Sequence, residues 1–432
     1  MKTLHFTNAW HEQSGGIRTF YLQLMRHAPA HNHEMCMVVP AAQDGIEEIN
    51  SHARVRYVRS WQAPFNRAYR MLAPHSYLAP RSPIARILNE ESPGLVEICD
   101  KYSLPYLGGL IRIGMLPGYR ARPTVTALSC ERLDENIAAY LGLGPSASAL
   151  APHLLRWLYF PLADHHIAVS RHTAGELHEV SNGHKVTRGL WLGPMGVDLE
   201  TFSPSLRTRP YAAGGELNLL YAGRLVPEKN TQLLLDTMAR LGDDIPARLL
   251  IAGDGILREP LQRAAAALAP GRVTFLGHIA SRTELALLLA NADAFLHPNP
   301  REPFGIAPLE AMASGTPLIA PTTGGVTTYA HTGNAWLSEP AGGAFAASIR
   351  SILFDPEDRE RRVAEALLTA SRFGWPEAAA HFFRLYAALH AIRLGSSPEH
   401  FPPALFYSTS HRSCFDAAAL TGSGLYNKFT GK

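Results

Sequence analysis

Two glutamates spaced eight positions apart form the most informative pattern in this sequence. Glu302 precedes a Pro-Phe-Gly turn and Glu310 lies in the apolar stretch after it, within "EPFGIAPLEAMASGTPLIAP". Pro303 and Gly305 predict a turn and then a helix, whose free backbone N–H groups and positive dipole end would bind a phosphate. Carboxylates accept pairs of hydrogen bonds from hydroxyl groups. The pattern therefore favours a ligand with hydroxyl groups on both sides of a diphosphate, such as a nucleotide sugar.

A second loop supplies cations at an expected strand end. Arg224 and Lys229 occur in "YAGRLVPEKN", at and just after the end of a strand expected at 217–224. Arginine can bind a phosphate through two parallel hydrogen bonds, and lysine adds a compact positive charge. Exposed cations in loops are more often merely solvated. Their position beside the expected anion site is what favours diphosphate binding.

A double glycine follows the first expected strand. Gly15 and Gly16, in "HEQSGGIRTFYLQL", remove side chains where a backbone must approach a ligand closely, and we expect a helix directly after them. Such pairs also occur in ordinary turns. The stretch lacks the full G-x-G-x-x-G pattern, which counts against a nicotinamide or flavin enzyme.

Short strand patterns alternate with helical patterns along most of the chain. Strands are expected at 3–8, 35–40, 95–99, 124–128 and 165–170, and then at 217–224, 247–255, 272–277, 294–298 and 317–321. This alternation predicts an α/β protein with two successive doubly wound parallel sheets. Ligands of such sheets lie at the carboxyl ends of the strands, where the cations and glutamates occur.

Changes in composition suggest the domain boundaries. The segment 193–216 is rich in Gly, Pro and Ser and weak in periodicity, which is typical of a linker. The expected organisation is a first domain at 1–192, the linker, a second domain at 217–375, a helix at 376–393 that packs back on the first domain, and a tail at 394–432. The tail mixes Ser, Pro, Gly and His without a period, so we expect it to be flexible.

Composition also limits the classes of partner and compartment. The formal net charge of +3 does not demand a nucleic-acid partner, and no block of Lys and Arg occurs. The four cysteines lack C-x-x-C spacing, which favours a reducing cytosol. No apolar run of about 18 residues occurs, so we expect a cytoplasmic protein whose only membrane contact would be peripheral, at the inner face.

One basic, aromatic stretch is a candidate contact surface for an acceptor or a membrane. Residues 51–89 contain no Asp or Glu. The stretch holds Arg54, Arg56, Arg59, Arg67, Arg70, Arg81 and Arg86, interleaved with Tyr57, Trp61, Phe65, Tyr69 and Tyr77. Three interpretations are open, namely an anionic membrane surface, a site for a phosphorylated soluble acceptor, and a solvated face whose aromatic residues belong to the core.

No metal ion or other cofactor is expected. The adjacent His165 and His166 fall in an expected strand, where neighbouring side chains point to opposite faces and cannot easily chelate one ion.

The glutamate pattern resembles the E-x7-E motif of the family 4 retaining glycosyltransferases. "YAGRLVPEKN", "ADHHIAVSRHTAGEL" and "GPMGVDLETFSP" resemble the companion motifs in their usual order, and the similarity spans residues 1–390. The resemblance implies the GT-B fold, in which two Rossmann-like domains face a central cleft, the first on the acceptor side and the second holding the nucleotide-sugar donor. It implies a metal-independent hexosyltransferase that moves a sugar from a UDP-sugar or GDP-mannose to an acceptor hydroxyl, for example of a lipid-linked or cell-envelope glycan.

The resemblance also assigns roles to the glutamates and the cations. Arg224 and Lys229 would hold the donor diphosphate, and Glu302 would contact the donor sugar, which makes these three the implied catalytic residues. Glu310 would bind the ribose hydroxyl groups.

Backbone contacts to the donor are implied as well. They involve Phe304, Gly305 and Ile306 for the sugar and phosphate, and Gly15 and Gly16 for the diphosphate across the cleft. Relatives often carry a histidine near the donor sugar where this chain reads "TALSCERLDEN". Cys130 or Glu131 is expected to take over acceptor or sugar contacts there, with a buried structural thiol as the alternative for Cys130.

Two other functions are open at this point. A nucleotide-sugar epimerase of GT-B fold would convert the donor without an acceptor. A non-catalytic nucleotide-sugar binding protein would bind without turnover.

Overall fold

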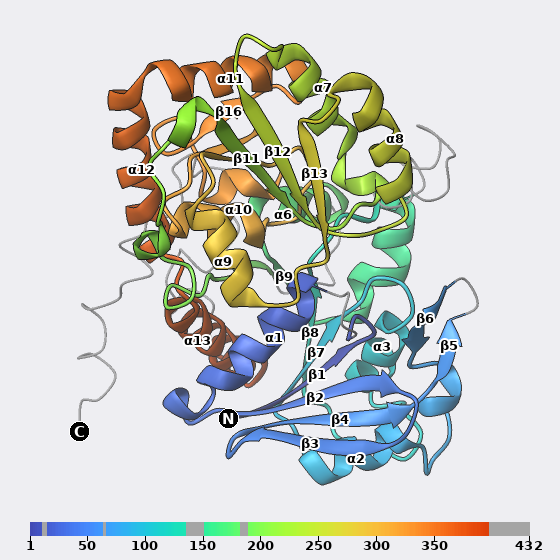
Figure 1. Cartoon of the computed structure of the whole chain (residues 1–432). Coiled ribbons are helices and arrows are strands. Elements are labelled where there is room, and N and C mark those ends of the chain that lie inside the picture. Colours follow the sequence, from blue (N-terminus) through green and yellow to red (C-terminus); the bar gives the residue numbers. More distant parts are fainter. Residues whose placement is uncertain (11–14, 64–65, 135–150, 182–188, 397–432) are drawn as a thin grey trace, which may run out of the picture. The chain divides into compact units, whose positions relative to one another are not determined.

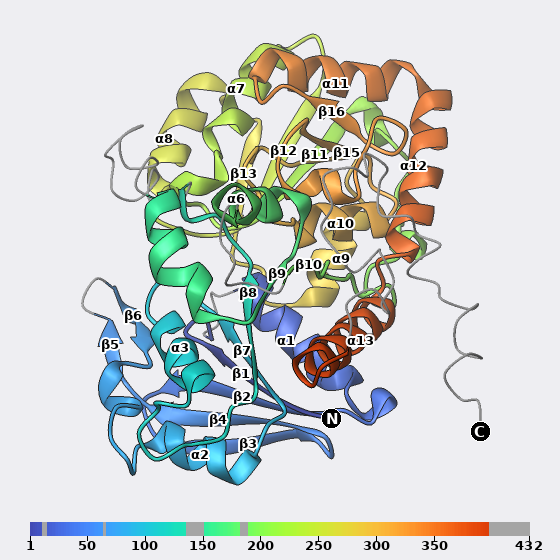
Figure 2. The ribbon, with the colours of Figure 1, turned by 180° about the vertical axis from the view of Figure 1, so that it is seen from behind.

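The computed structural model describes residues 1–10, 15–63, 66–134, 151–181 and 189–396. The chain divides into two compact units: unit 1 comprises Met1–Met195 and the segment from Trp375 onward, and unit 2 comprises Gly196–Gly374. Each unit is built around its own sheet, as Figures 1 and 2 show. Apart from its first three residues, the tail expected at 394–432 lies outside the described residues.

Unit 1 contains an eight-stranded sheet with the strand order β10-β9-β8-β7-β1-β2-β4-β3. Its strands are β1 (Lys2–Thr7), β2 (Glu34–Ala41), β3 (Gly45–Asn50), β4 (Ala53–Arg59), β7 (Leu95–Cys99), β8 (Thr124–Ser129), β9 (His165–Ala168) and β10 (Leu190–Leu192). All neighbouring pairs are parallel except β3 and β4. A separate hairpin consists of β5 (Trp61–Ala63) and β6 (Asn66–Met71).

The five strands expected in this half are confirmed as β1, β2, β7, β8 and β9. The additional strand β4 lies inside the basic stretch. Its residues alternate, with Val55 buried and Arg54 and Arg56 partly exposed, so a period of two was present in the sequence. The charges of this stretch suggested a contact surface, but two of its arginines belong to a strand.

Helices cover the sheet of unit 1 and include the C-terminal helix of the described chain. They are α1 (Gly15–His27), α2 (Pro83–Glu91), α3 (Pro105–Ile113), α6 (Arg171–Ser181) and α13 (Trp375–Arg393). Helix α13 packs against α1, where the rings of Phe20 and Phe382 lie 4.8 Å apart (Figure 1). The helix expected at 376–393 is therefore present, and it belongs to unit 1.

A buried polar cluster joins these two helices to the sheet. The Glu97 carboxylate on β7 accepts hydrogen bonds at Oε1 from the Tyr21 hydroxyl on α1, at 2.8 Å, and from the Tyr386 hydroxyl on α13, at 3.2 Å. The His5 ring lies 3.0 Å from the same oxygen. These contacts at Oε1 join α1 and α13 to the sheet, whereas Glu97 Oε2 is buried without a hydrogen-bond partner within the described ranges.

Unit 2 contains a six-stranded parallel sheet with the order β13-β12-β11-β14-β15-β16. Its strands are β11 (Leu217–Ala222), β12 (Ala247–Ala252), β13 (Val273–Gly277), β14 (Ala294–Leu296), β15 (Leu318–Pro321) and β16 (Trp336–Ser338). Its helices are α7 (Gln232–Leu241), α8 (Arg258–Leu268), α9 (Arg282–Ala290), α10 (Ile306–Ala313), α11 (Gly342–Phe354) and α12 (Pro356–Ser371). Helices α7 and α11 pack together, and the five expected strands are all present (Figure 1).

The segment interpreted as a linker differs from that expectation. Residues from Gly196 onward belong to unit 2, where Arg207 and Arg209 form ion pairs of 2.7 and 2.8 Å with the fully buried Asp293. A buried carboxylate needs such compensation. The composition of 193–216 is that of a linker, but its two arginines anchor it to a residue some 80 positions away.

No helix within the described ranges is long and apolar enough to cross a lipid bilayer.

Candidate active site

The turn before α10 is built as the sequence predicts. Gly305 is the N-cap residue of α10 with φ of 89°, a left-handed conformation that glycine adopts without steric cost. No side chain caps this end of the helix, and the third helical residue, Pro308, has no N–H group. The remaining backbone N–H groups and the positive end of the helix dipole thus lie open to an anion.

Aromatic residues hold this turn in position. The Tyr329 hydroxyl donates a hydrogen bond to the Gly305 carbonyl, and its ring lies 5.4 Å from that of Phe304 and 6.0 Å from that of Phe373. Tyr329 and Phe304 are both buried. The turn is therefore supported by packing from two other segments of unit 2.

A second glycine, which the sequence reasoning did not single out, packs against the same turn. The Gly325 N–H donates to the Glu302 carbonyl at 2.5 Å. A Cβ atom at Gly325 would lie 2.0 Å from the Pro303 carbonyl oxygen, a separation at which the backbone must move. Because Gly325 has no side chain, its loop can contact the loop that carries Glu302 and Pro303.

We expect Gly325→Ala to destabilise unit 2 by about 1–2 kcal/mol and to weaken nucleotide binding, because the turn that carries Glu302 must shift. Thermal denaturation and nucleotide titration measure the two effects. Gly343→Ala is the matched control, since a Cβ atom there meets nothing within 4 Å. Equal melting temperatures for Gly325→Ala and Gly343→Ala would contradict the prediction.

Lys229 and Glu302 form an ion pair beside this turn. Lys229 Nζ lies 2.7 Å from Glu302 Oε2, and the side chains are 20% and 14% exposed. Asn299 Nδ2 donates to the same oxygen at 3.0 Å. The Lys229 loop is itself tied down, because Asn230, with φ of 52°, donates to the Pro298 carbonyl at 3.0 Å. The structure thus brings together two residues 73 positions apart, as the sequence predicted.

The electrostatics of the pair keep Glu302 ionised. Burial alone would raise the pKa of Glu302, but the charge of Lys229, the nearby His297 and hydrogen bonds from Lys229 and Asn299 lower this pKa to about 2. At neutral pH the site therefore presents a carboxylate that can accept hydroxyl hydrogen bonds, next to an ammonium group that can bind phosphate.

The depressed pKa of Glu302 predicts a pH dependence of stability. Because the folded-state pKa of about 2 lies below the ordinary value of 4.5, the stabilising contribution is complete above pH 4.5 and is lost as the pH falls toward 2. The difference in free energy of unfolding between wild type and Glu302→Gln should shrink by on the order of 2 kcal/mol over that window. Denaturant titrations at pH 6 and pH 3 measure it, with the exposed Glu259→Gln as control. A difference that stays constant would refute the assignment.

Arg224 lies after β11, as expected, with its side chain half exposed. Its Nη2 lies 3.3 Å from Glu228 Oε1. Ion pairs at the protein surface contribute little stability, so Arg224 could leave Glu228 for another anion at little cost. Arg224 is thus available to a phosphate near Lys229, in the same loop.

Glu310 is buried in α10 and has a partner that sequence reasoning missed. Arg282, at the start of α9, donates from Nη2 to Glu310 Oε1 at 2.8 Å, and its guanidinium lies 4.8 Å from the centre of the Phe202 ring. Burial raises the pKa of Glu310, while Arg282 opposes that rise. Arg282 occurs in an ordinary helical pattern, so no local signal marked it.

His297 is a further residue that the sequence reasoning passed over. It follows β14 directly and is buried, and burial lowers its pKa to about 4, so its ring is neutral at neutral pH. Its Nε2 has no hydrogen-bond partner within the described ranges. A histidine at the carboxyl end of a parallel strand was a signal that could have identified it.

The remaining candidates belong to unit 1. Gly15 and Gly16 form the first turn of α1, which therefore starts at the double glycine and not after it. Gly15 has φ of 47°, and both glycines are exposed. Their contact with a diphosphate held by unit 2 stays a prediction.

Cys130 and Glu131 follow β8, at the carboxyl edge of the first sheet. Cys130 Sγ lies 3.8 Å from Cys99 Sγ, and this hydrogen bond together with burial raises the pKa of Cys130 well above its ordinary value. The Glu131 carbonyl accepts hydrogen bonds from Lys101 and Ser129. Their acceptor or sugar contacts stay a prediction.

The two adjacent histidines of unit 1 have separate partners. His166 Nε2 lies 3.0 Å from the Phe160 carbonyl oxygen, and His165 Nδ1 accepts from Trp191 Nε1 at 3.3 Å. Across the described residues, no group of three or more His, Cys, Asp or Glu side chains is arranged to hold a metal ion.

Comparison with known proteins identifies the class to which this chain belongs. Residues 206–367, which include every candidate in unit 2, match the family model "Glycosyl transferases group 1". A GDP-mannose-dependent alpha-mannosyltransferase of Mycolicibacterium smegmatis is 30% identical over 319 residues, covering 72% of this chain and 76% of that protein. The chain belongs to the group 1 glycosyltransferase family.

Another relative aligns over nearly the whole chain. The GDP-mannose-dependent alpha-(1-6)-phosphatidylinositol dimannoside mannosyltransferase of Mycobacterium tuberculosis is 29% identical over 398 residues, covering 90% of this chain and 97% of that protein. Together these similarities establish an enzyme, a glycosyltransferase that uses nucleotide sugars.

Solved structures show the fold. Sucrose-phosphate synthase from Thermosynechococcus elongatus superposes with a TM-score of 0.70 at 21% identity, covering 90% of this chain and 99% of that one. Anabaena HepE, in complex with UDP and glucose, superposes with a TM-score of 0.65 at 17% identity, covering 90% of this chain and 100% of that one. The predicted GT-B fold, with two parallel-sheet α/β domains, is confirmed.

Proposed function

We propose that this enzyme transfers a hexosyl group, with retention of anomeric configuration, from a nucleoside diphosphate sugar to an acceptor hydroxyl, as the family 4 enzymes do. The observation that carries the proposal is the ion pair of Lys229 with Glu302 beside the uncapped start of α10. This arrangement places an ammonium group and a carboxylate beside the positive end of a helix dipole.

Each of these groups has a role in the proposed reaction. Lys229, Arg224 and the start of α10 stabilise the negative charge that develops on the departing diphosphate, so no metal ion is required. Glu302 accepts hydrogen bonds from the donor sugar, and Glu310 accepts them from the ribose. The backbone of Phe304, Gly305 and Ile306 contacts sugar and phosphate.

Retention in this proposal follows from attack on one face. The acceptor oxygen bonds to the anomeric carbon on the face from which the diphosphate leaves, as the bond between that carbon and the phosphate oxygen breaks. A departing phosphate oxygen takes the acceptor proton. The products are the glycoside and a nucleoside diphosphate.

GDP-mannose is the donor we propose first, and a UDP-sugar is the alternative. The support is that both mannosyltransferase relatives named above are called GDP-mannose-dependent. The name of the Mycobacterium tuberculosis relative also includes a phosphatidylinositol dimannoside. We therefore include a lipid-linked acceptor, met at the inner face of an anionic membrane, in the proposal.

Calorimetric titration with GDP, UDP, GDP-mannose and UDP-glucose tests the donor site. Tight binding of one nucleotide and its sugar conjugate is expected. Proton NMR of the glycoside, recorded before the anomers equilibrate, then reports the configuration. An inverted product would refute retention, and failure of all four ligands to bind would refute the donor site.

A further inference from the structure

The arginines of the basic stretch fall into two groups. Arg54 and Arg56 on β4 are paired with Glu91 and Glu90, which follow the acid-free stretch, at N–O distances of 2.5 and 2.6 Å. Arg59, at the end of β4, has no carboxylate partner within the described ranges, although Asp44 accepts a hydrogen bond from its backbone N–H at 2.7 Å. The charges of Arg54 and Arg56 are thus neutralised by carboxylates of the fold, whereas the charge of Arg59 is available to bind a ligand.

The available charge lines a cavity in unit 1. The cavity has a volume of about 760 Å³ and is lined by residues that include Asp44, Arg59, Trp61, Gln62, Arg70 and His75. It lies where the parallel strands β2 and β4 end, at the register pair Ala41 and Arg59, and the β5–β6 hairpin contributes to its wall. The carboxyl ends of parallel strands are where doubly wound sheets bind ligands.

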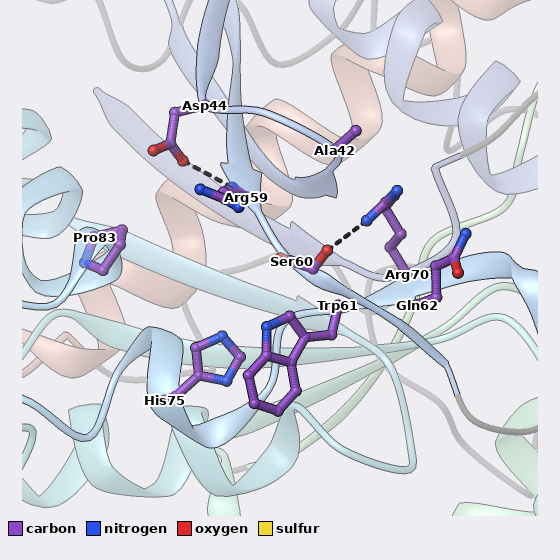
Figure 3. A pocket seen from close by; sticks show the side chains of 9 residues that line it. All are labelled: Ala42, Asp44, Arg59, Ser60, Trp61, Gln62, Arg70, His75 and Pro83. Carbon is purple, nitrogen blue, oxygen red and sulfur yellow. Dashed lines mark hydrogen bonds between the residues drawn. The ribbon is translucent and has the colours of Figure 1, made fainter.

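An exposed aromatic platform forms part of the lining. The Trp61 side chain is 72% exposed, yet its indole ring is stacked on the His75 imidazole, with centroids 4.6 Å apart and planes inclined by 30° (Figure 3). Stacking holds the indole in one orientation and leaves its other face open. An indole face is suited to the C–H face of a sugar or cyclic polyol ring, which is apolar while the rim of the ring is polar.

The polar groups around this platform match a phosphorylated ring. Arg59 supplies a cation beside the platform, and Arg70 Nη1 donates to the Ser60 carbonyl at 2.6 Å (Figure 3). Arg70 is paired with Gln62 across the hairpin, so both side chains lie on the face opposite to Trp61 and add only to the charge and polarity of the lining. Arginine binds phosphate oxygens through paired hydrogen bonds. Asp44 supplies oxygen atoms that accept hydrogen bonds from ring hydroxyl groups. Two arginines against one aspartate leave the cavity net positive.

We propose that this cavity binds the phosphate-bearing sugar or cyclic polyol ring of the acceptor. The proposal rests on the proposed function and names the acceptor chemistry for it. The ring stacks on Trp61, and Arg59 binds its phosphate. In a soluble acceptor this phosphate is a monoester, and in a lipid headgroup it is a diester. In both cases the cavity would recognise the same phosphate-bearing ring.

Calorimetry on the full chain, saturated with whichever nucleotide it binds, tests the cavity. The probes are myo-inositol 1-phosphate, glucose 6-phosphate, inorganic phosphate and myo-inositol. A ring phosphate should bind at least ~10-fold more tightly than either inorganic phosphate or the unphosphorylated ring. Arg59→Gln and Trp61→Ala should each weaken it by ~10-fold. Arg81→Gln, an equal charge change at an exposed arginine outside the cavity lining, should change affinity less than about twofold.

Competition with vesicles separates the two sources of the phosphate. Preferential binding to vesicles of phosphatidylinositol in phosphatidylcholine, displaced by soluble inositol phosphate, would assign the ring to a lipid headgroup. Binding of soluble ring phosphates without vesicle binding would assign it to a soluble acceptor. Equal binding to phosphatidylglycerol vesicles without such displacement would overturn the proposal in favour of a general membrane surface.

Further outcomes keep this proposal separate from the proposed function. Unchanged ring-phosphate affinity in Arg59→Gln and Trp61→Ala would refute the cavity. Nucleotide binding without any ring-phosphate binding would also refute it and leave the donor site intact. Loss of nucleotide binding alone would count against the donor site. Both variants change exposed side chains, and circular dichroism would verify that each is folded.

Discussion

Lys229→Ala is expected to lower the rate of donor turnover by about 100- to 1000-fold. The ammonium group lies 2.7 Å from Glu302, next to the start of α10, where negative charge would develop on the leaving diphosphate. Nucleoside diphosphate affinity should also fall, by about 1–3 kcal/mol, because a charge-assisted hydrogen bond is lost. Release of nucleoside diphosphate from the donor and calorimetric titration measure the two effects.

Two variants serve as controls for Lys229→Ala. Lys229→Arg keeps the positive charge and should retain part of the affinity. Arg263→Ala removes an exposed cation on α8, at 4.0 Å from its nearest carboxylate, and should leave affinity and turnover unchanged. A readout specific to the site is the pKa of Glu302, which NMR should find raised in Lys229→Ala. Normal turnover in Lys229→Ala would exclude the role assigned to it.

Glu310→Gln is expected to weaken nucleotide binding by about 1–3 kcal/mol, or roughly 5- to 150-fold. The carboxylate is only 4% exposed and is oriented by Arg282, so an amide cannot reproduce its charge-assisted hydrogen bonds to a ribose. Titration with the preferred nucleotide measures the loss.

The ribose assignment has its own control. A 2′,3′-dideoxynucleotide lacks the hydroxyl groups that Glu310 would bind, so wild type and Glu310→Gln should bind it with equal affinity. If the substitution weakens binding of both nucleotides by the same factor, Glu310 acts through the fold or through Arg282 and not through the ribose. Comparing melting temperatures shows how much the loss of the Arg282 partner destabilises unit 2.

The donor-side candidates could be inferred from the sequence because the carboxyl ends of parallel strands meet at one edge of a sheet. Lys229 follows β11 and Glu302 follows β14, and these two strands are neighbours in the sheet of unit 2. The turn at Gly305 could also be predicted from the sequence, because a glycine that follows a proline and precedes an apolar helical run usually marks a turn before a helix.

Other elements depended on contacts that no local pattern encodes. Arg282 reaches Glu310 from the preceding helix, and Gly325 packs on the loop of Glu302. The linker was assigned from its composition, but Arg207 binds the buried Asp293. In the basic stretch, the sequence showed how many arginines there are, and only folding revealed which of them Glu90 and Glu91 neutralise.

The sequence alone specified the α/β class, the ten strands that were expected, and the turn and loops where an anion site is predicted, because hydrophobic period and turn chemistry are local properties of the chain. Tertiary structure decided which side chains are partners and which remain available. It paired Lys229 with Glu302 and Glu310 with Arg282, and it left Arg59 in the lining of a cavity. Electrostatic partnership depends on distance in space, and the order of strands in a sheet, which sets that distance, is fixed only when the whole domain folds.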